Sequence, residues 1–248
     1  MCDWSAVLAL YCASLAGMGA LSLAVRRAGA TRRSHWFWLH AAGNAAVCAM
    51  AAPAVAQIWR DPARAIYVPR DPRVPYVPPV DGLWIAMLHL YHVACFRDVP
   101  WADVLHHALF VPYSQVALLA PGLWGWPVGW GPVVQLQHIF ICGLPGLLDY
   151  ACLALRRDHK MSVAAQKRAQ VKLNVWLRVP GVLASCTLLL FETLRYRAEH
   201  RATPPRMWPV VLSNCALIGS NALYYAEQVV RAFPPRHACP PSRHAPQE

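Results

Sequence analysis

Two long apolar runs without a charged side chain most constrain how this chain can fold. Residues 4–25 contain no Asp, Glu, Lys or Arg, and residues 37–58 repeat the pattern with nine alanines between Ala41 and Ala56. An α-helix needs about 20 apolar residues to cross the hydrocarbon core of a bilayer, which is about 30 Å thick. Each run therefore predicts a transmembrane helix. The first follows no basic segment and is too long for the apolar part of a signal peptide, so we expect an uncleaved span.

The composition of the 248-residue chain excludes a water-soluble globule. Charged residues make up 14% of the sequence, whereas soluble domains carry about 25%, and the 57% hydrophobic content also excludes a disordered chain. The net charge of +11 does not predict nucleic-acid binding, because the basic residues lie between apolar runs, as in loops beside membrane spans. The nine cysteines form no CxxC pair, so neither a zinc site nor a disulfide framework is predicted.

Five further apolar runs bring the expected number of membrane spans to seven, which predicts an all-α, polytopic fold. They cover residues 83–96, 102–120, 133–155, 173–194 and 208–230. The first of these five is short, and we expect the second to bend or break near Pro112. The Pro-rich residues 59–81 predict an irregular loop, and residues 231–248 predict a disordered tail.

The distribution of Lys and Arg predicts the orientation of these spans. With the N-terminus outside, the inner segments carry 14 basic residues and the outer segments carry 8. Cytoplasmic loops are the ones enriched in Lys and Arg. We therefore expect a lumenal N-terminus and a cytosolic C-terminus.

Ionisable side chains inside the apolar runs mark the candidate site, because they are costly in lipid and are commonly functional. At 1.5 Å per residue, five different spans place such groups within about 10 Å of the expected inner side. These groups are His92, His106, His107, Asp149, Arg178 and Glu227. Taken singly, His89 and His138 are explained at least as readily by packing or by solvation at the membrane interface as by a functional role. Arg178 suits either extension to the lipid headgroups or anion binding.

The adjacent pair His106–His107 is the sharpest of these signals. Asp103 precedes the two histidines by three and four positions, so on a helix it can orient one imidazole. Paired histidines with a carboxylate partner suit general-base or nucleophilic chemistry near neutral pH. Membrane di-iron enzymes use about eight histidines in HxxxH and HxxHH clusters, and the sequence contains no HxxHH. We therefore expect no metal.

Three segments together resemble the TLC-domain family, which includes the ceramide synthases. They are residues 97–107 (RDVPWADVLHH), residues 135–150 beginning QLQH and ending Asp149–Tyr150, and residues 174–178 (NVWLR). The resemblance covers residues 37–230 and implies a six-helix membrane barrel. Residues 1–36 would then form an added N-terminal helix with a basic inner loop, and residues 231–248 a tail. The family also implies an endoplasmic reticulum or other endomembrane location.

In ceramide synthases the paired histidines support transfer of a fatty acyl group from acyl-CoA to a sphingoid amine. Carried over, the catalytic residues would be His106 and His107, with Asp103 or Asp149 orienting them. We expect the substrate to be bound by His92, His138, Asn174 and Arg178. Ceramide synthases carry His-Asp-x-x-Asp in the following span, whereas here His138 is followed by IFIC and no acid occurs until Asp149.

Two classes of function therefore stay open. One is an acyltransferase that uses acyl-CoA as co-substrate, with no cofactor and a membrane lipid as acceptor. The other is a non-enzymatic lipid-binding, lipid-sensing or membrane-organising protein of the same fold. A seven-helix receptor is disfavoured, because the expected helix ends contain neither Asp-Arg-Tyr nor Asn-Pro-x-x-Tyr. The sequence predicts no nucleic-acid partner.

Overall fold

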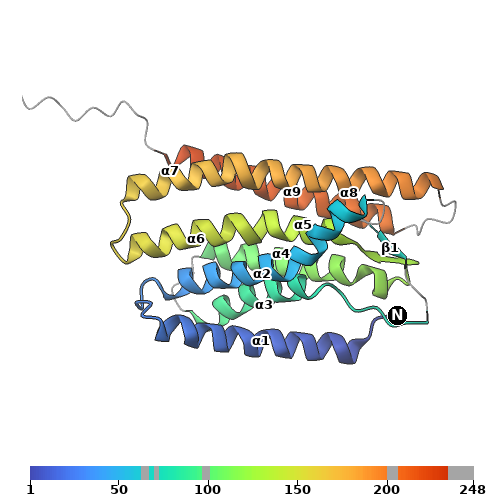
Figure 1. Cartoon of the computed structure of the whole chain (residues 1–248), viewed down its shortest axis with the longest axis horizontal. Helices are drawn as coiled ribbons and strands as arrows, with labels where there is room; N and C mark the ends of the chain where they lie inside the picture. The colour runs from blue at the N-terminus through green and yellow to red at the C-terminus, as the bar shows by residue number, and fades with distance from the viewer. Residues whose placement is uncertain (63–66, 70–72, 97–100, 200–205, 234–248) are drawn as a thin grey trace, which may run out of the picture.

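The computed structural model describes residues 1–62, 67–69, 73–96, 101–199 and 206–233, and its helices run side by side along the long axis (Figure 1). The expected tail at 231–248 lies almost wholly outside the described residues. The elements follow in the order α1 (Trp4–Arg27), α2 (His35–Arg60), β1 (Tyr67–Pro69), α3 (Val80–Cys95), α4 (Trp101–Leu123), β2 (Val128–Trp130), α5 (Pro132–His138), η2 (Ile139–Gly143), α6 (Leu144–Arg157), α7 (Val163–Leu173), η3 (Asn174–Arg178), α8 (Val179–Glu199) and α9 (Met207–Arg231).

The helices confirm the expected all-α membrane class. Among the described residues, α1, α2 and the continuous stretches Pro132–Arg157 and Val163–Glu199 are long and apolar enough to cross a membrane, and α3 is a shorter apolar helix. Only 22% to 28% of the most apolar windows of these four stretches is buried inside the protein. Large apolar side chains such as Leu8, Leu109 and Phe191 point outward instead. A lipid environment suits such a surface, because contiguous exposed apolar area is rare in soluble monomers.

Several boundaries differ from those the sequence predicts. The helix α4 continues through Pro112 and Pro121 to Leu123, so of the bend or break expected near Pro112 the break is not found. The run expected at 173–194 belongs to a helical stretch that extends from Val163 to Glu199. Residues 67–69 lie in the expected irregular loop, yet they form β1, which pairs antiparallel with β2. The expected loop between α4 and α5 thus contributes a strand.

The N-terminus lies at the same end of the molecule as β1 (Figure 1). Cys2 forms a parallel bridge with Tyr76, and Asp3 caps α1 by accepting the Ala6 N–H at 3.0 Å. The hydrogen bond from the Ala6 N–H and a second one from the Ser5 hydroxyl hold the pKa of the Asp3 carboxyl below its ordinary value. These contacts fix the entry of α1 beside the loop that precedes α3.

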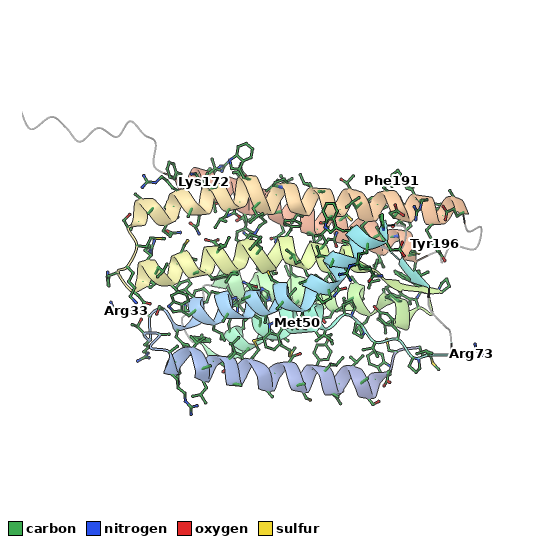
Figure 2. All side chains as sticks on the ribbon, viewed as in Figure 1. Arg33, Met50, Arg73, Lys172, Phe191 and Tyr196 are labelled. Carbon is green, nitrogen blue, oxygen red and sulfur yellow. The ribbon has the colours of Figure 1, made fainter. Side chains whose placement is uncertain are left out.

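The opposite end of the molecule, here called the basic end, contains the α1–α2 connection and the α6–α7 turn; Figure 2 labels Arg33 there and Arg73 far from it. It is defined by Arg26, Arg27, Arg32, Arg33, Arg156, Arg157 and Lys160. Asp158 ties the two connections together by accepting hydrogen bonds from Thr31 Oγ1 at 2.9 Å and Trp38 Nε1 at 3.1 Å. Partial burial raises the pKa of Asp158, but hydrogen bonds from Ser34, Trp38 and Thr31 and the charge of Lys160 outweigh it, so the pKa lies below the ordinary 3.8.

Two wide π-helical turns, η2 and η3, interrupt the helices that carry Asp149 and Arg178. A proline lies two residues after the end of each turn, Pro145 after η2 and Pro180 after η3. A proline within a helix lacks the N–H and clashes with the carbonyl four residues earlier, which here lies inside the π turn. Wide turns of this kind are frequent at functional sites.

Candidate functional site

A polar cavity of about 490 Å³, here called the vestibule, lies among α2, α3, α4, α6, α7 and α9. Its polar lining comes from His40, Asn44, His89, His92, His106, His107, Asp149, Tyr150, Lys167, Gln170, Arg178, Asn221, Tyr225 and Gln228. The vestibule is therefore a polar-lined space within a helical protein whose outer surface carries many apolar side chains. Buried polar groups of this number require partners, since each unpaired one is costly.

Five imidazoles form one wall of the vestibule, and we call His40, His89, His92, His106 and His107 the histidine cluster. His40 Nε2 and His92 Nδ1 share a hydrogen bond of 3.0 Å. The ring of His107 lies 4.6 Å from those of His89 and His92 and 5.2 Å from that of His106, between ring centroids. Within the described part of the chain, no group of three or more His, Cys, Asp or Glu residues is arranged to hold a metal ion.

Aromatic rings support the histidine cluster from two sides. Tyr150 stacks on His40 at 4.5 Å, and Trp36 meets His40 edge-on at 5.6 Å. On the other side Phe110 stacks on His106 at 4.3 Å. These contacts restrict rotation of the imidazoles, which favours defined proton-transfer geometry over a loosely solvated arrangement.

The wall facing the histidine cluster carries charge. Arg178 Nη1 donates to Asn174 Oδ1 at 2.7 Å, and Asn174 Nδ2 donates to the Gln170 carbonyl at 2.9 Å. Asn174 is buried and is absent from the lining, so it holds Arg178 in position and does not face the cavity. Lys167 adds a second cation on the same wall.

Several polar atoms on this lining have no hydrogen-bond partner among the described residues. They are Asn44 Oδ1, Asp149 Oδ1, Gln170 Oε1 and Arg178 Nε. Buried polar groups in native proteins are nearly always paired, so unpaired ones beside a cavity call for a solvent or ligand partner. The set offers three oxygen acceptors and one cationic donor.

A second, largely apolar cavity of about 130 Å³, here called the inner chamber, adjoins the vestibule. The two cavities share the lining residues His89, His106, His107, Ile141, Cys142 and Asn221. Beyond them the chamber is walled mainly by apolar side chains, including Val111, Leu118 and Trp130. His106 and His107 thus stand where a polar space meets an apolar one.

An Asp–His pair lies at the inner chamber. Asp81 Oδ2 accepts from His138 Nδ1 at 2.7 Å, and Asp81 Oδ1 accepts from Gln135 Nε2 at 3.3 Å. The Asp81 side chain is fully buried, whereas the His138 side chain is 15% exposed and lines the chamber.

The structure gathers most of the predicted site residues around the two cavities. His92, His106, His107, Asp149 and Arg178 line the vestibule, and His138 lines the inner chamber. Asn174 acts through Arg178, as described above. The side chain of Asp103 lies outside the described residues, so its expected role beside His106 and His107 stays a prediction.

Sequence reasoning missed His40, Tyr150 and Asp81. His40 and Asn44 lie one turn apart on α2, a polar spacing inside the Ala-rich run that marks an inward face. Asp81 was assigned to the Pro-rich loop, but α3 begins at Val80 and includes it. No protein-family model, curated protein or solved structure matches the chain.

Proposed function

We propose that this chain is a TLC-type membrane enzyme that transfers a fatty acyl group from acyl-CoA to a lipid amine, with the reaction centred on His106 and His107. The observation that carries the proposal is the junction of the two cavities at these histidines. An amphipathic thioester fits such a junction with its polar part in the vestibule and its alkyl chain in the apolar chamber. Its carbonyl carbon then lies beside the imidazoles.

In this reaction the amine nitrogen attacks the thioester carbon, the new C–N bond forms and the C–S bond breaks. One amine proton leaves, and the departing thiolate takes up a proton. Imidazoles suit both transfers, because they exchange protons near neutral pH. Holding the two substrates in one enclosed space converts a bimolecular encounter into a near-unimolecular step.

The charges of the vestibule support an anionic co-substrate. Lys167 and Arg178 line it, and Arg178 Nε is without a hydrogen-bond partner in the described part of the chain. Guanidinium groups bind phosphates by charge-assisted hydrogen bonds. If acyl-CoA enters from the basic end, its phosphates lie on the cytosolic side. The proposal includes seven spans, a lumenal N-terminus and an endomembrane location.

The proposal is tested by untargeted lipidomics of cells that make the wild type or the His106→Ala/His107→Ala double variant at matched membrane levels. His159→Asn, in the exposed turn after α6, is the control. An N-acyl lipid should accumulate with the wild type and the control, and fall by about 10²-fold or more with the double variant. Equal lipid profiles in all three would exclude catalysis by this pair.

The unpaired atoms of Asn44, Asp149 and Gln170 also favour a second function, namely non-enzymatic binding of a lipid headgroup in the vestibule. In that case a lipid should copurify with the protein in equal amount from wild type and double variant. Its loss in Arg178→Gln, without a change in cellular lipid species, would support binding over catalysis.

A further inference from the structure

A third cavity, here called the basic pocket, lies at the basic end of the molecule. It has a volume of about 610 Å³ and is lined by four cationic side chains, those of Arg33, Arg156, Arg157 and Lys160. Among the described residues it shares no part of its lining with the vestibule or the inner chamber. The proposed acyl transfer does not use it.

The cations of the basic pocket come from two connections that are far apart in the sequence. Arg33, which Figure 2 labels, lies in the α1–α2 connection, and the other three lie at the end of α6 and in the α6–α7 turn. Asp158 ties the two connections together by the hydrogen bonds described above. The Arg157 guanidinium lies 5.6 Å from the centre of the Phe37 ring on α2. These contacts bring the cations together before any ligand binds.

The charge of the basic pocket indicates the anion that fits it. Its described lining contains no Asp or Glu. The one acidic residue of the two connections is Asp158, and its carboxylate oxygens accept from Thr31 and Trp38. Four cations and this carboxylate leave three net positive charges, which repel one another unless an anion joins them. A phosphate monoester carries about 1.5–2 negative charges at neutral pH, so a monoester together with a singly charged phosphodiester balances the pocket.

The basic pocket lies outside the hydrocarbon core of the membrane. In the helical stretch Val163–Glu199, Arg178 is the sole charged residue between Lys172 and Glu192. These 20 residues span about 30 Å, which is the thickness of the core. Val163, which lines the pocket, lies nine residues beyond Lys172, or about 14 Å. Since a headgroup layer adds only about 5–8 Å on each side, the pocket stands further out than the phosphodiesters of the bilayer.

This level favours a lipid with a second phosphate on its headgroup. In a phospholipid the phosphodiester joins glycerol to the headgroup, so a phosphate monoester on the headgroup projects further from the hydrocarbon core. Long Arg and Lys side chains extend to meet it, and guanidinium groups bind phosphate by paired, charge-assisted hydrogen bonds. Basic pockets between transmembrane helices bind phosphorylated headgroups of this kind.

We propose that the basic pocket is a binding site for a phospholipid whose headgroup carries a phosphate monoester, with its acyl chains in the bilayer beside the basic end. The inference is independent of the proposed acyl transfer, because it uses neither the histidine cluster nor the vestibule. A lipid bound there links the α1–α2 connection to the α6–α7 turn. Its binding should therefore raise the Tm.

The test is native mass spectrometry of the full-length protein in detergent, which reports how many lipids are bound and their apparent Kd. The probes are phosphatidylinositol monophosphate and phosphatidylinositol, which differ by one phosphate monoester. The wild type should bind the monophosphate at least about tenfold more tightly, the usual effect of a charge-assisted hydrogen bond. Equal affinity for the two lipids would overturn the proposal.

Two matched pairs of substitutions locate the site. Arg156→Gln/Arg157→Gln removes two cations of the pocket from the last turn of α6, and Arg26→Gln/Arg27→Gln removes two from the last turn of α1, outside the described lining. Both lower the charge of the basic end equally. The first should weaken monophosphate binding at least about tenfold and abolish the rise in Tm, whereas the second should preserve both. Equal losses in the two would show general attraction to a basic surface and overturn the proposal.

Two further arms separate binding from folding and lipid from soluble phosphate. Lys160→Gln changes an exposed residue of the turn, so it should weaken monophosphate binding while leaving the Tm of the lipid-free protein unchanged. Unchanged affinity in this variant would contradict the site. Free CoA and the water-soluble headgroup, inositol bisphosphate, should bind at least about tenfold more weakly than the lipid. If either binds as tightly, the pocket is a site for a soluble phosphate and the lipid proposal is wrong.

Discussion

Replacement of Gly181 by alanine tests the packing between the two helices that contain π turns. Gly181 lies in α8 three residues after the end of η3, against Phe140 of η2. A Cβ at Gly181 would lie 2.1 Å from Phe140 Cδ1, 2.3 Å from Cγ and 2.6 Å from Cε1. Carbon atoms in contact prefer separations of about 3.5–4.0 Å. The ring or the helix must therefore move by more than 1 Å, beside the residues that line both cavities.

The expected cost follows from two opposing terms. Added methyl groups in a packed interior cost about 1–3 kcal/mol, and the three short contacts to one ring place this variant near 3 kcal/mol. Alanine is favoured over glycine inside a helix by about 1 kcal/mol. The net loss of unfolding free energy should be about 2 kcal/mol.

Gly19→Ala is the matched control, because Gly19 lies in α1 and nothing stands within 4 Å of its Cβ position. That variant should gain about 1 kcal/mol, so the two variants differ by about 3 kcal/mol. At 2–4 °C per kcal/mol for a chain of this size, their Tm values should differ by about 6–12 °C. The assay is thermal unfolding of the purified proteins in one detergent. Equal Tm values would refute the close approach of Gly181 to Phe140.

Three further variants report on the two ends of the molecule. Ser162→Ala removes the cap of α7, in which Ser162 Oγ accepts the Ala165 N–H at 3.2 Å. The variant should lose about 1 kcal/mol of unfolding free energy and therefore have a lower Tm. An unchanged Tm would show that the cap is not formed. Asp158→Asn should lower the Tm at neutral pH. Because the folded-state pKa of Asp158 lies below 3.8, its stabilisation is present above that pH and is lost as the pH falls through the folded-state value. The difference should therefore shrink as the pH is lowered below 3.8, and a difference that does not change as the pH is lowered would contradict the assignment. The Trp126 side chain is only 1% exposed, so Trp126→Ala should lose about 3–5 kcal/mol of unfolding free energy, measured by denaturant titration. A loss below about 1 kcal/mol would place Trp126 outside the core.

The helical fold was predictable because the apolar runs are long and the charged residues lie between them. The run at 4–25 corresponds to Trp4–Arg27, and the run at 37–58 corresponds to His35–Arg60. The strands β1 and β2 were not predictable, because each has three residues and depends on pairing with a segment 60 residues away. Whether α4 bends or breaks at Pro112 was left open, since local sequence shows the loss of an N–H but not the packing that offsets it.

The candidate site was predictable as a set of polar residues in apolar runs, but not as a set of pairs. His106, His107 and Arg178 stand out because charge and imidazole are rare in such runs. The hydrogen bond of His40 to His92 and that of Asp81 to His138 each join residues more than 50 positions apart. Such pairings depend on which helix faces which, and a single sequence does not contain that information.

The π turn η2 allows one helical stretch to serve two cavities. In an uninterrupted α-helix, eleven positions at about 100° each end about 20° past three full turns, so His138 and Asp149 would share a face. The wide turn absorbs one extra residue, which turns everything after it by about 100° and separates the two side chains by about 80°. His138 then faces the inner chamber and Asp149 the vestibule. If residues 139–143 instead formed a regular α-helix with the same number of residues, both side chains would lie on one face and would point toward a single cavity.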